Sequence, residues 1–479
     1  MLRSTKIVAT LGPASSDPAV LERMIRAGVD VVRLNFSHGS AEEHLARARQ
    51  VKDLSRRVGR TVAIMCDLQG PKIRIGRFRE GRVRLEKGQR FVLDANCELG
   101  DATRVGLDYK ELPRDVEPGA VLLLDDGRLV LDVVAVRGHE VHTTVRHGGE
   151  LSDHKGINRQ GGGLSAPALT PKDIEDIRTA VAMQADYLAV SFPKSGADLY
   201  MARELVHAAG GKAFLIAKIE RAEAVREEAL RDILRECDGI MVARGDLAVE
   251  VGDAAVPALQ KKMIRIAREA NKLAITATQM MESMVSSPVP TRAEVSDVVN
   301  AVLDGTDAVM LSAETASGKY PVEVIEAMDR ICVEAEQTVP VNLDRDFLDR
   351  VFTRVDQAVA MAALFTAYHM KAKAIATLTE SGATALWMSR LNCGVPIYAL
   401  TSQTATRYRC ALFRDVYPLM VKYVGHDREE LLGEAEKVLV ENRVVAEGDL
   451  IVVTIGEPIG KPGGTNTMKI VRVGEHRRP

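Results

Sequence analysis

Short apolar runs alternate with amphipathic helical stretches along most of the first 345 residues. In one such unit, Asp17 can cap a helix that has Pro18 at its first position, and Gly28 ends the helix just before an apolar run. This alternation is typical of a parallel sheet wrapped by helices. The candidate strands are residues 5–10, 29–36, 61–68, 187–192, 213–220, 239–246, 273–279 and 308–314. Eight parallel strands close a barrel, so the pattern predicts an α/β fold of the (β/α)8 TIM-barrel type.

Two regions depart from this alternation. Between the third and fourth strands, short apolar runs are separated by turns such as Asp125-Asp126-Gly127, which predicts an inserted β-barrel domain. A separate α/β domain is predicted near the end of the chain, from helix 355–369, strand 374–378, helix 384–391 and strand 396–400. We therefore expect three domains, namely a catalytic barrel at 1–69 and 168–345, a β lid at 70–167 and an α/β regulatory domain at 346–479.

The composition argues against several partners and locations. The 64 basic and 66 acidic residues give a formal charge of −2, so no global field holds the chain on nucleic acid or on a membrane. No apolar stretch of about 18 residues is present, and no secretory apolar core follows Met1. The six cysteines are scattered without a CxxC pair, which favours buried reduced thiols. We expect a soluble cytoplasmic protein that binds neither nucleic acid nor membrane.

Polar residues stand at the carboxyl ends of seven candidate strands. In a barrel of this type the loops after the strands form the open face that carries the reactive groups. Any one such residue can be a satisfied structural polar group, but seven strand ends together favour a catalytic site. The residues are Arg33, Asn35, Asp67, Ser191, Lys218, Glu220, Arg244, Asp246, Thr278, Ser312 and Glu314.

Three of these residues suit phosphoryl transfer. Lys218 and Glu220 lie on the same side of one strand, and Asp246 supplies a second carboxylate. Two carboxylates with open positions suit a divalent cation such as Mg²⁺, which takes its other ligands from water and substrate phosphate. Lys218 would neutralise charge on the moving group, because this chemistry depends on positioning and charge stabilisation. The alternative for Lys218 is a Schiff-base nucleophile.

Five segments resemble motifs of the pyruvate kinase family and occur in family order: residues 5–15, 33–39, 67–74, 241–247 and 276–284. The resemblance spans essentially the whole chain. It implies transfer of a phosphoryl group from phosphoenolpyruvate to ADP, giving pyruvate and ATP in glycolysis. It also implies a homotetramer that uses Mg²⁺ (or Mn²⁺).

The resemblance further implies roles for individual residues. Glu220 and Asp246 would bind the metal, and Arg33 and Lys218 would hold the transferring phosphate. The implied substrate-binding set is Arg33, Lys218, Ala243, Arg244, Gly245, Asp246 and Thr278, and Ser312 would belong to a proton relay. The nucleotide would contact Asn35, His38, Arg74 and Lys155, although a structural histidine is an alternative for His38.

Potassium is required by many members of this family. The residues that match its site are Asn35, Ser37, Asp67 and Leu68. Potassium-dependent members have glutamate after the Gly-Pro of this motif, whereas Lys72 stands here. We expect the Lys72 ammonium to lie near Asp67 and supply the missing charge, so that K⁺ is not required. The alternative is that Lys72 points into solvent.

The inserted domain is expected to close over the nucleotide as a lid, with hinges at Gly70-Pro71 and 161–167. A rigid decorative domain is the alternative. Ala248 and Ala313 stand where the family commonly has glycine, and their methyl groups would crowd a turn of positive φ.

A phosphate-binding loop is predicted in the C-terminal domain, where strand 374–378 leads into a helix. An allosteric effector would bind there, at Thr379, Ser381, Gly382 and Thr384. Glu380 opposes a second phosphate, so a sugar monophosphate or a nucleoside monophosphate is favoured over fructose 1,6-bisphosphate. The alternative is an ordinary helix cap.

Two other functions fit parts of the sequence. A Mg²⁺-dependent aldolase or lyase also places a glutamate and an aspartate at barrel strand ends, but it needs neither Arg33 nor a basic lid. A non-catalytic metabolite sensor would retain the fold and act through its C-terminal domain, and it would not need the intact set Lys218, Glu220, Asp246 and Thr278.

Overall fold

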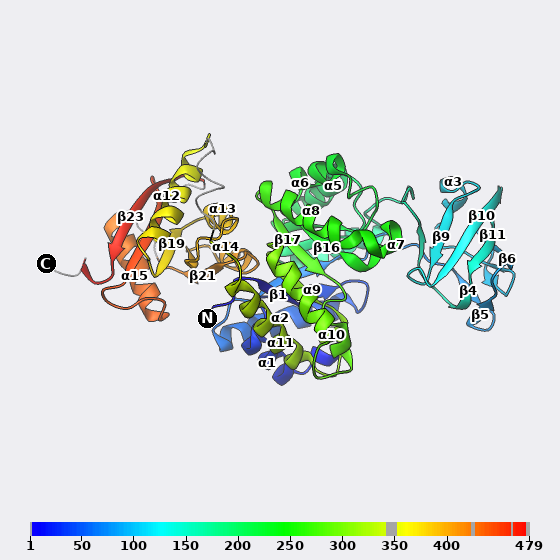
Figure 1. Cartoon of the computed structure of the whole chain (residues 1–479), viewed down its shortest axis with the longest axis horizontal. Coiled ribbons are helices and arrows are strands. Elements are labelled where there is room, and N and C mark those ends of the chain that lie inside the picture. Colours follow the sequence, from blue (N-terminus) through cyan, green and yellow to red (C-terminus); the bar gives the residue numbers. More distant parts are fainter. Residues whose placement is uncertain (1, 342–351, 423–426, 461–462, 476–479) are drawn as a thin grey trace.

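Eight parallel strands form a closed barrel in the middle of the molecule (Figure 1). The computed structural model describes residues 2–341, 352–422, 427–460 and 463–475. Around the barrel the strands are β1 (Lys6–Thr10), β2 (Val31–Asn35), β3 (Ala63–Asp67), β14 (Tyr187–Val190), β15 (Phe214–Ile219), β16 (Gly239–Ala243), β17 (Leu273–Ala277) and β18 (Ala308–Leu311). All eight predicted strands are therefore confirmed, and the TIM-barrel fold with them.

The barrel is held by apolar side chains on both sides of its strands. Along β1, Ile7 and Ala9 pack under the surrounding helices, whereas Val8 points into the barrel. This alternation follows from the period of two along a strand, and burial on both faces is typical of parallel sheets.

Helices cover the outside of the barrel. They are α1 (Pro18–Ala27), α2 (Ala41–Val58), α4 (Pro171–Ala182), α5 (Gly196–Ala208), α6 (Glu227–Glu236), α7 (Arg244–Val251), α8 (Val256–Glu269), α9 (Arg292–Leu303), α10 (Ala313–Ala316) and α11 (Pro321–Gln337). As predicted, Asp17 caps α1, and Gly28 follows it with a φ of +127°. Short 3₁₀ turns occur at Pro13–Ser15, Asp253–Ala255 and Glu282–Val285.

Helix α7 corrects one predicted boundary. The expected strand 239–246 ends at Ala243, because α7 begins with Arg244. Gly245 and Asp246 therefore lie in the first turn of a helix, where backbone N–H groups lack partners within the helix. The position of this turn at a strand end is important for the site.

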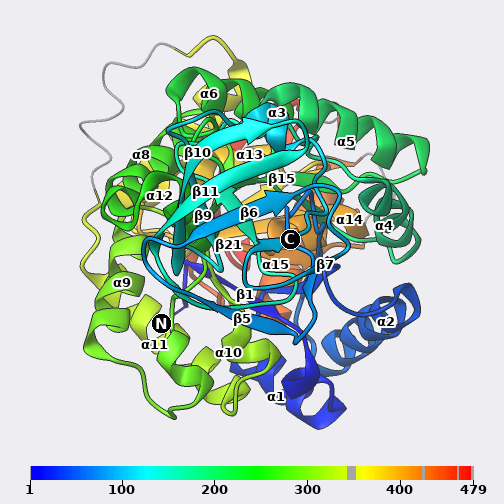
Figure 2. The same cartoon turned by 90° about the vertical axis from the view of Figure 1, so that its right-hand side faces the viewer.

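The inserted region lies beyond the carboxyl ends of the barrel strands, as Figures 1 and 2 show. Its elements are β4 (Arg77–Phe78), β5 (Arg82–Leu85), β6 (Arg90–Asp94), β7 (Leu99–Gly100), β8 (Arg104–Val105), α3 (Leu112–Asp115), β9 (Val121–Leu124), β10 (Leu129–Arg137), β11 (Glu140–His147), β12 (Gly149–Ser152) and β13 (Ile157–Arg159). The inserted region is an all-β domain, as expected, apart from the short helix α3. The strands make one six-stranded sheet and two two-stranded sheets around a common apolar cluster.

The C-terminal region packs against the opposite end of the barrel (Figure 1). A five-stranded sheet has the order β21 (Val416–Met420), β20 (Ile397–Thr401), β19 (Ala374–Leu378), β22 (Leu450–Gly456) and β23 (Thr465–Arg472). Its helices are α12 (Val355–His369), α13 (Ala383–Ser389), α14 (Thr404–Cys410) and α15 (Arg428–Glu441). The separate α/β domain is therefore confirmed. Among the described residues, no helix combines the length and apolar character needed to cross a membrane.

Candidate active site

A buried group of paired charges lies at the carboxyl ends of β2, β3 and β15. The Asp67 carboxylate accepts from Arg33 Nε at 2.6 Å, and its other oxygen is 3.3 Å from Lys218 Nζ. Burial alone would raise the pKa of Asp67, but Arg33 and Lys218 outweigh that effect and hold the pKa below its ordinary value. Asp67 is therefore a charged anchor that orients two cations from neighbouring strands.

Lys218 also contacts Glu220 and Ser191. Its Nζ lies 2.9 Å from Glu220 Oε1 and donates to Ser191 Oγ at 2.8 Å. Burial lowers the pKa of Lys218, but the adjacent Asp67 and Glu220 carboxylates raise it well above its ordinary value. The Lys218 ammonium is therefore stably charged.

Glu220 is the one carboxyl group of this cluster whose charge is poorly compensated. Burial raises its pKa to about 7, the Asp246 carboxylate adds to the effect, and Lys218 opposes it. Its second oxygen accepts from the backbone N–H of Phe192 at 2.8 Å. A divalent cation between Glu220 and Asp246 would relieve this unfavourable charge, so the donor set fits a metal of the Mg²⁺ type.

Lys72, at the start of the inserted domain, lies close to Asp246 of the carboxylate pair Glu220 and Asp246. Its Nζ lies 3.4 Å from Asp246 Oδ1 and 4.0 Å from Asp126 Oδ1. The expectation that Lys72 lies near Asp67 is therefore wrong, because Arg33 and Lys218 already occupy that carboxylate. The alternative of a purely solvated Lys72 is wrong as well.

Three of the four residues that match the potassium site use their oxygen atoms in contacts within the chain. Asn35 Oδ1 accepts from the backbone N–H of Ser37 at 3.1 Å. The carbonyl oxygen of Leu68 accepts from Ser191 Oγ at 2.7 Å. Asp67 pairs with Arg33 and Lys218, so the side-chain or carbonyl oxygen atoms of Asn35, Asp67 and Leu68 all have partners within the chain.

The Arg244 side chain holds the backbone of Thr278 in place. The buried Arg244 guanidinium donates to the Thr278 carbonyl at 2.6 Å and pairs with Asp297 at 2.8 Å. Thr278 has a φ of +70°, a strained value for a β-branched residue, and its Oγ1 accepts from Gly245 N–H at 2.8 Å. The structure thus places the Arg244 side chain in a network that holds Thr278 beside the first turn of α7.

A cavity of about 620 Å³ opens beside Arg33. Its lining brings together predicted residues Arg33, Asn35, His38 and Ser312, and it adds Thr10, Glu43 and Arg47, which the sequence reasoning missed. Thr10 Oγ1 accepts from Arg33 Nη1 at 3.1 Å. The available signal for Thr10 was its place as the last residue of a strand.

The comparisons with known proteins agree with this geometry. A family model described as pyruvate kinase, barrel domain, matches residues 2–325, and one described as pyruvate kinase, alpha/beta domain, matches residues 357–471. The chain belongs to the pyruvate kinase family. A protein named Pyruvate kinase II from Salmonella typhimurium is 52% identical over 476 residues, which cover 98% of this chain and 99% of the relative.

Further relatives support the same assignment. A pyruvate kinase from Haemophilus influenzae is 52% identical and covers 95% of this chain and 96% of its own length. One from Geobacillus stearothermophilus is 41% identical over 98% of this chain and 80% of its own length. Membership of the family at this level of identity makes the chain an enzyme with pyruvate kinase activity, and the family as a whole depends on divalent cations.

The lid residues expected to contact nucleotide make contacts within the lid. Lys155 Nζ pairs with Asp125 at 2.7 Å, and Arg74 Nη1 donates to the carbonyl of His154 at 3.0 Å. The hinge glycine Gly70 has a φ of +66°, and a Cβ there would lie 2.7 Å from Ser191 Cβ. Glycine is therefore required where the chain leaves the barrel.

The two alanines that depart from the family pattern are accommodated. Ala248 lies inside α7, and Ala313 begins α10. Neither is among the residues with positive φ, so the expected crowding of a strained turn is wrong.

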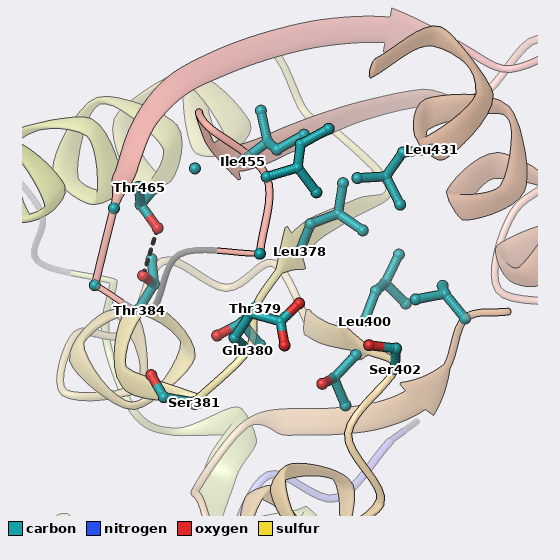
Figure 3. Close-up of a pocket in the computed structure, with 17 residues that line it drawn as sticks. Leu378, Thr379, Glu380, Ser381, Thr384, Leu400, Ser402, Leu431, Ile455 and Thr465 are labelled. Atoms are coloured by element: carbon teal, nitrogen blue, oxygen red, sulfur yellow. Dashed lines mark hydrogen bonds between the residues drawn. The ribbon is translucent and has the colours of Figure 1, made fainter. Parts of the chain in front are cut away.

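The predicted effector loop borders a second cavity, of about 170 Å³, in the C-terminal domain. Figure 3 shows Thr379, Ser381, Thr384 and Thr465 on one side of this cavity and the apolar side chains of Leu400, Leu431 and Ile455 on the other. Thr384 and Thr465 hydroxyls are 2.8 Å apart. Gly382 does not line this cavity and borders a neighbouring one instead, so its predicted place in the effector site is wrong. Its N–H donates to Thr379 Oγ1 at 2.9 Å.

Proposed function

We infer that this enzyme transfers the phosphoryl group of phosphoenolpyruvate to ADP in glycolysis, with Mg²⁺ (or Mn²⁺) held by Glu220 and Asp246. The observation that carries this inference is the convergence of Arg33 and Lys218 on Asp67 beside that carboxylate pair. When bound, the metal would supply charge stabilisation for phosphate oxygens.

The chain's own residues account for the remaining requirements. Arg33 and Lys218 offer two fixed cations for the transferring phosphate. The first turn of α7, with Ala243 before it, offers N–H groups to the substrate carboxylate. Substrate would compete there with Thr278 Oγ1 for the Gly245 N–H. Ser312, which lines the large cavity, would take part in delivering a proton through water.

The rival chemistries are less well supported. A Schiff-base lysine needs a neutral amine, whereas Asp67 and Glu220 hold Lys218 in its charged form. An aldolase or lyase would not depend on ADP. A coupled assay that follows pyruvate formation from phosphoenolpyruvate tests this directly. We expect product only when ADP and a divalent cation are both present; pyruvate or cleavage products without ADP would contradict the proposal.

The nucleotide is proposed to bind between the large cavity and the lid. Asn35 and His38 border that cavity, and Arg74 and Lys155 stand on the lid side of the hinges. Because their present partners are lid groups, closure must reorient these two cations. Lys155→Met is expected to raise the KM for ADP about tenfold and leave the KM for phosphoenolpyruvate within twofold.

Activity without potassium is proposed on the charge balance of the cluster. The carboxylates and cations are equal in number: Asp67, Glu220 and Asp246 against Arg33, Lys218 and Lys72. Lys72 thus contributes the positive charge that K⁺ would otherwise supply. Assays with an organic counter-ion test it, and activity that appears only with K⁺ would refute it. Lys72→Glu removes one cation and adds one anion, so we expect it to create K⁺ dependence.

A monophosphate effector is proposed for the C-terminal cavity. The hydroxyls of Thr379, Ser381 and Thr384 would bind the phosphate, while the Glu380 carboxylate, which accepts from Gln403 at 3.0 Å, would repel a second one. We expect sugar or nucleoside monophosphates to activate at lower concentration than fructose 1,6-bisphosphate. Glu380→Gln should narrow that difference. The bisphosphate as strongest activator of the native enzyme would overturn the choice.

Two broader properties remain proposals. We propose a homotetramer, as the family resemblance implies, and sedimentation of the native enzyme tests it. A cytoplasmic location is also proposed. It agrees with six cysteines that form no disulfide with one another.

A further inference from the structure

Lys72 connects the inserted domain to a proposed metal ligand of the barrel. Its ammonium lies 3.4 Å from Asp246 Oδ1 in α7 and 4.0 Å from Asp126 Oδ1 in the turn between β9 and β10. Among the described residues, Lys72 is the only cation within 4 Å of the Asp246 carboxylate. The contact joins residues 174 positions apart in the sequence.

The hinge fixes where this ammonium lies. Gly70 packs against Ser191, its N–H donates to Asp173 at 3.1 Å, and Lys72 N–H donates back to the Gly70 carbonyl at 3.0 Å. On the lid side, Ile157 N–H donates to the carbonyl of Ile73 at 2.9 Å. Strand β13 of the lid is therefore bonded to Ile73, the residue after Lys72. A rotation of the lid must then also move Lys72.

The same carboxylate cannot serve both cations equally well. A divalent ion held by Glu220 and Asp246 would place two positive charges close to an ammonium 3.4 Å from one ligand oxygen. Lys218 meets a similar repulsion at Glu220, but Asp67 and Ser191 also hold its ammonium in a buried position. Lys72 is more exposed and has no such additional partners beyond Asp126 among the described residues. Metal binding is thus expected to repel Lys72, and Asp126 offers the nearest alternative carboxylate on the lid.

We propose that Lys72 is a positioning residue that occupies Asp246 in the metal-free enzyme and moves to the lid carboxylate Asp126 when the divalent cation binds. This inference rests on the proposed metal ligands and goes beyond them. Through this exchange, loading of the metal removes the ion pair between Lys72 of the lid and Asp246 of α7. The metal site and the lid hinge are therefore thermodynamically coupled.

Metal binding without substrates tests the first half of the proposal. Free Mn²⁺ in mixtures with the full-length enzyme is measured by electron paramagnetic resonance, so no turnover is involved. Lys72→Met is expected to lower the Kd for Mn²⁺ at least fivefold, because the competing cation is gone. Lys72→Gln should do the same. A Kd within twofold of the native value for both variants would overturn the proposal.

A matched control and a ligand variant separate the possible failures. Arg128 lies on the same lid turn, 3.7 Å from Asp125 and largely exposed, so Arg128→Met should leave Mn²⁺ binding within twofold. Asp246→Asn should weaken Mn²⁺ binding at least tenfold. If it does not, the metal assignment itself fails. If it does while Lys72→Met has no effect, only the role of Lys72 fails.

The lid half of the proposal requires a distance measurement. Spin labels are placed at Arg137→Cys in the lid and Arg178→Cys in α4, both exposed, with the partly exposed Cys97 replaced by serine. With Lys72 present, Mg²⁺ should broaden or shift the distance distribution. With Lys72→Met, the metal-free distribution should already match that of the Mg²⁺-loaded protein. An identical Mg²⁺ response in both proteins would contradict the coupling.

Discussion

Charged clusters occupy both ends of the barrel, yet they are built differently. At the carboxyl ends of the strands, Lys218 is shared between Asp67 and Glu220, and Arg33 of the same cluster borders a cavity of about 620 Å³. At the opposite end, Arg390 from the C-terminal domain forms a buried ion pair with both oxygens of Asp307.

The difference lies in how completely the charges are satisfied. Asp307 also accepts from the backbone N–H groups of Ala274 at 2.9 Å and Arg414 at 3.1 Å, so its carboxylate is fully coordinated by protein. Glu220 is undersatisfied, with a pKa raised to about 7 by burial. An ion pair whose partners are all protein groups, such as Arg390–Asp307, fixes the geometry of a domain interface. A carboxylate with too few partners beside a cavity, such as Glu220, can still gain stabilisation from a charged ligand.

Removing the central cation of the open cluster gives the largest expected effect. Lys218→Met should lower kcat about 10³-fold, because a charge that stabilises the transferring phosphoryl group is lost. Proton exchange on pyruvate should be less affected, since enolisation does not require phosphoryl transfer. Steady-state assays are run well below the melting temperature of the variant.

The control for this change is Lys261→Met, an exposed lysine of α8 that pairs with Asp304. It should alter kcat by no more than twofold. Because Lys218 contacts two buried carboxylates, some loss of thermal stability is also expected, which the sequence alone did not indicate. A kcat within tenfold of the native value would show that the lysine is not used on the phosphate.

Breaking the closed pair should affect stability and spare the chemistry. Arg390→Met leaves Asp307 buried without its cation, which is expected to cost about 3 kcal/mol or more in the free energy of unfolding. The free energy of unfolding is measured by urea denaturation, followed by the fluorescence of Trp387. Trp387 is the single tryptophan and lies in α13, close to Arg390 in sequence. The kcat of the folded variant should stay within twofold of the native value.

Replacing both members of the pair tests the interpretation. Arg390→Met combined with Asp307→Leu removes the unpaired charge, so part of the lost stability should return. A double variant that is less stable than the sum of both single changes predicts would show that packing, and not the unpaired charge, dominates this interface.

Local features of the barrel could be predicted from the sequence. The barrel strands were predictable because apolar runs such as 61–68 lie between small-residue turns and are buried on both faces. Lys218 and Glu220 were predictable as neighbours because a strand repeats every two residues. These are local regularities, and they carry through to the structure.

The features that the sequence did not predict depend on contacts between segments that are distant in sequence. The partner of Lys72 is set by how the lid lies over α7, which no local pattern encodes. The support that the Arg244 side chain gives to the Thr278 carbonyl likewise joins two separate segments, and the sequence alone did not indicate it. The inserted strands are as short as two residues, so their pairing into sheets could not be deduced from periodicity.

The smallest and most specific expected effect concerns Asp186, which precedes β14 at the end of the barrel that faces the C-terminal domain and has no ion-pair partner among the described residues. Asp186 accepts from the backbone N–H of Ile64 at 2.8 Å, and burial raises its pKa to about 7 while Lys52 and Arg409 oppose the rise. The folded protein therefore holds a proton that the unfolded chain releases above its ordinary pKa near 4. Stability from this group is present at low pH and lost as pH rises toward 7.

Asp186→Asn should accordingly stabilise the protein, because asparagine can still accept from Ile64 and carries no charge to bury. The gain in melting temperature is expected to be a few degrees at pH 8 and clearly smaller at pH 5, since the native carboxyl group is mostly protonated there in the folded state. Differential scanning calorimetry of both proteins at the two pH values measures it. An equal gain at both pH values would mean that the substitution acts through packing, and a loss of stability at pH 8 would mean that the Asp186 carboxylate is stabilised by Lys52 and Arg409 like the paired carboxylates of the open end.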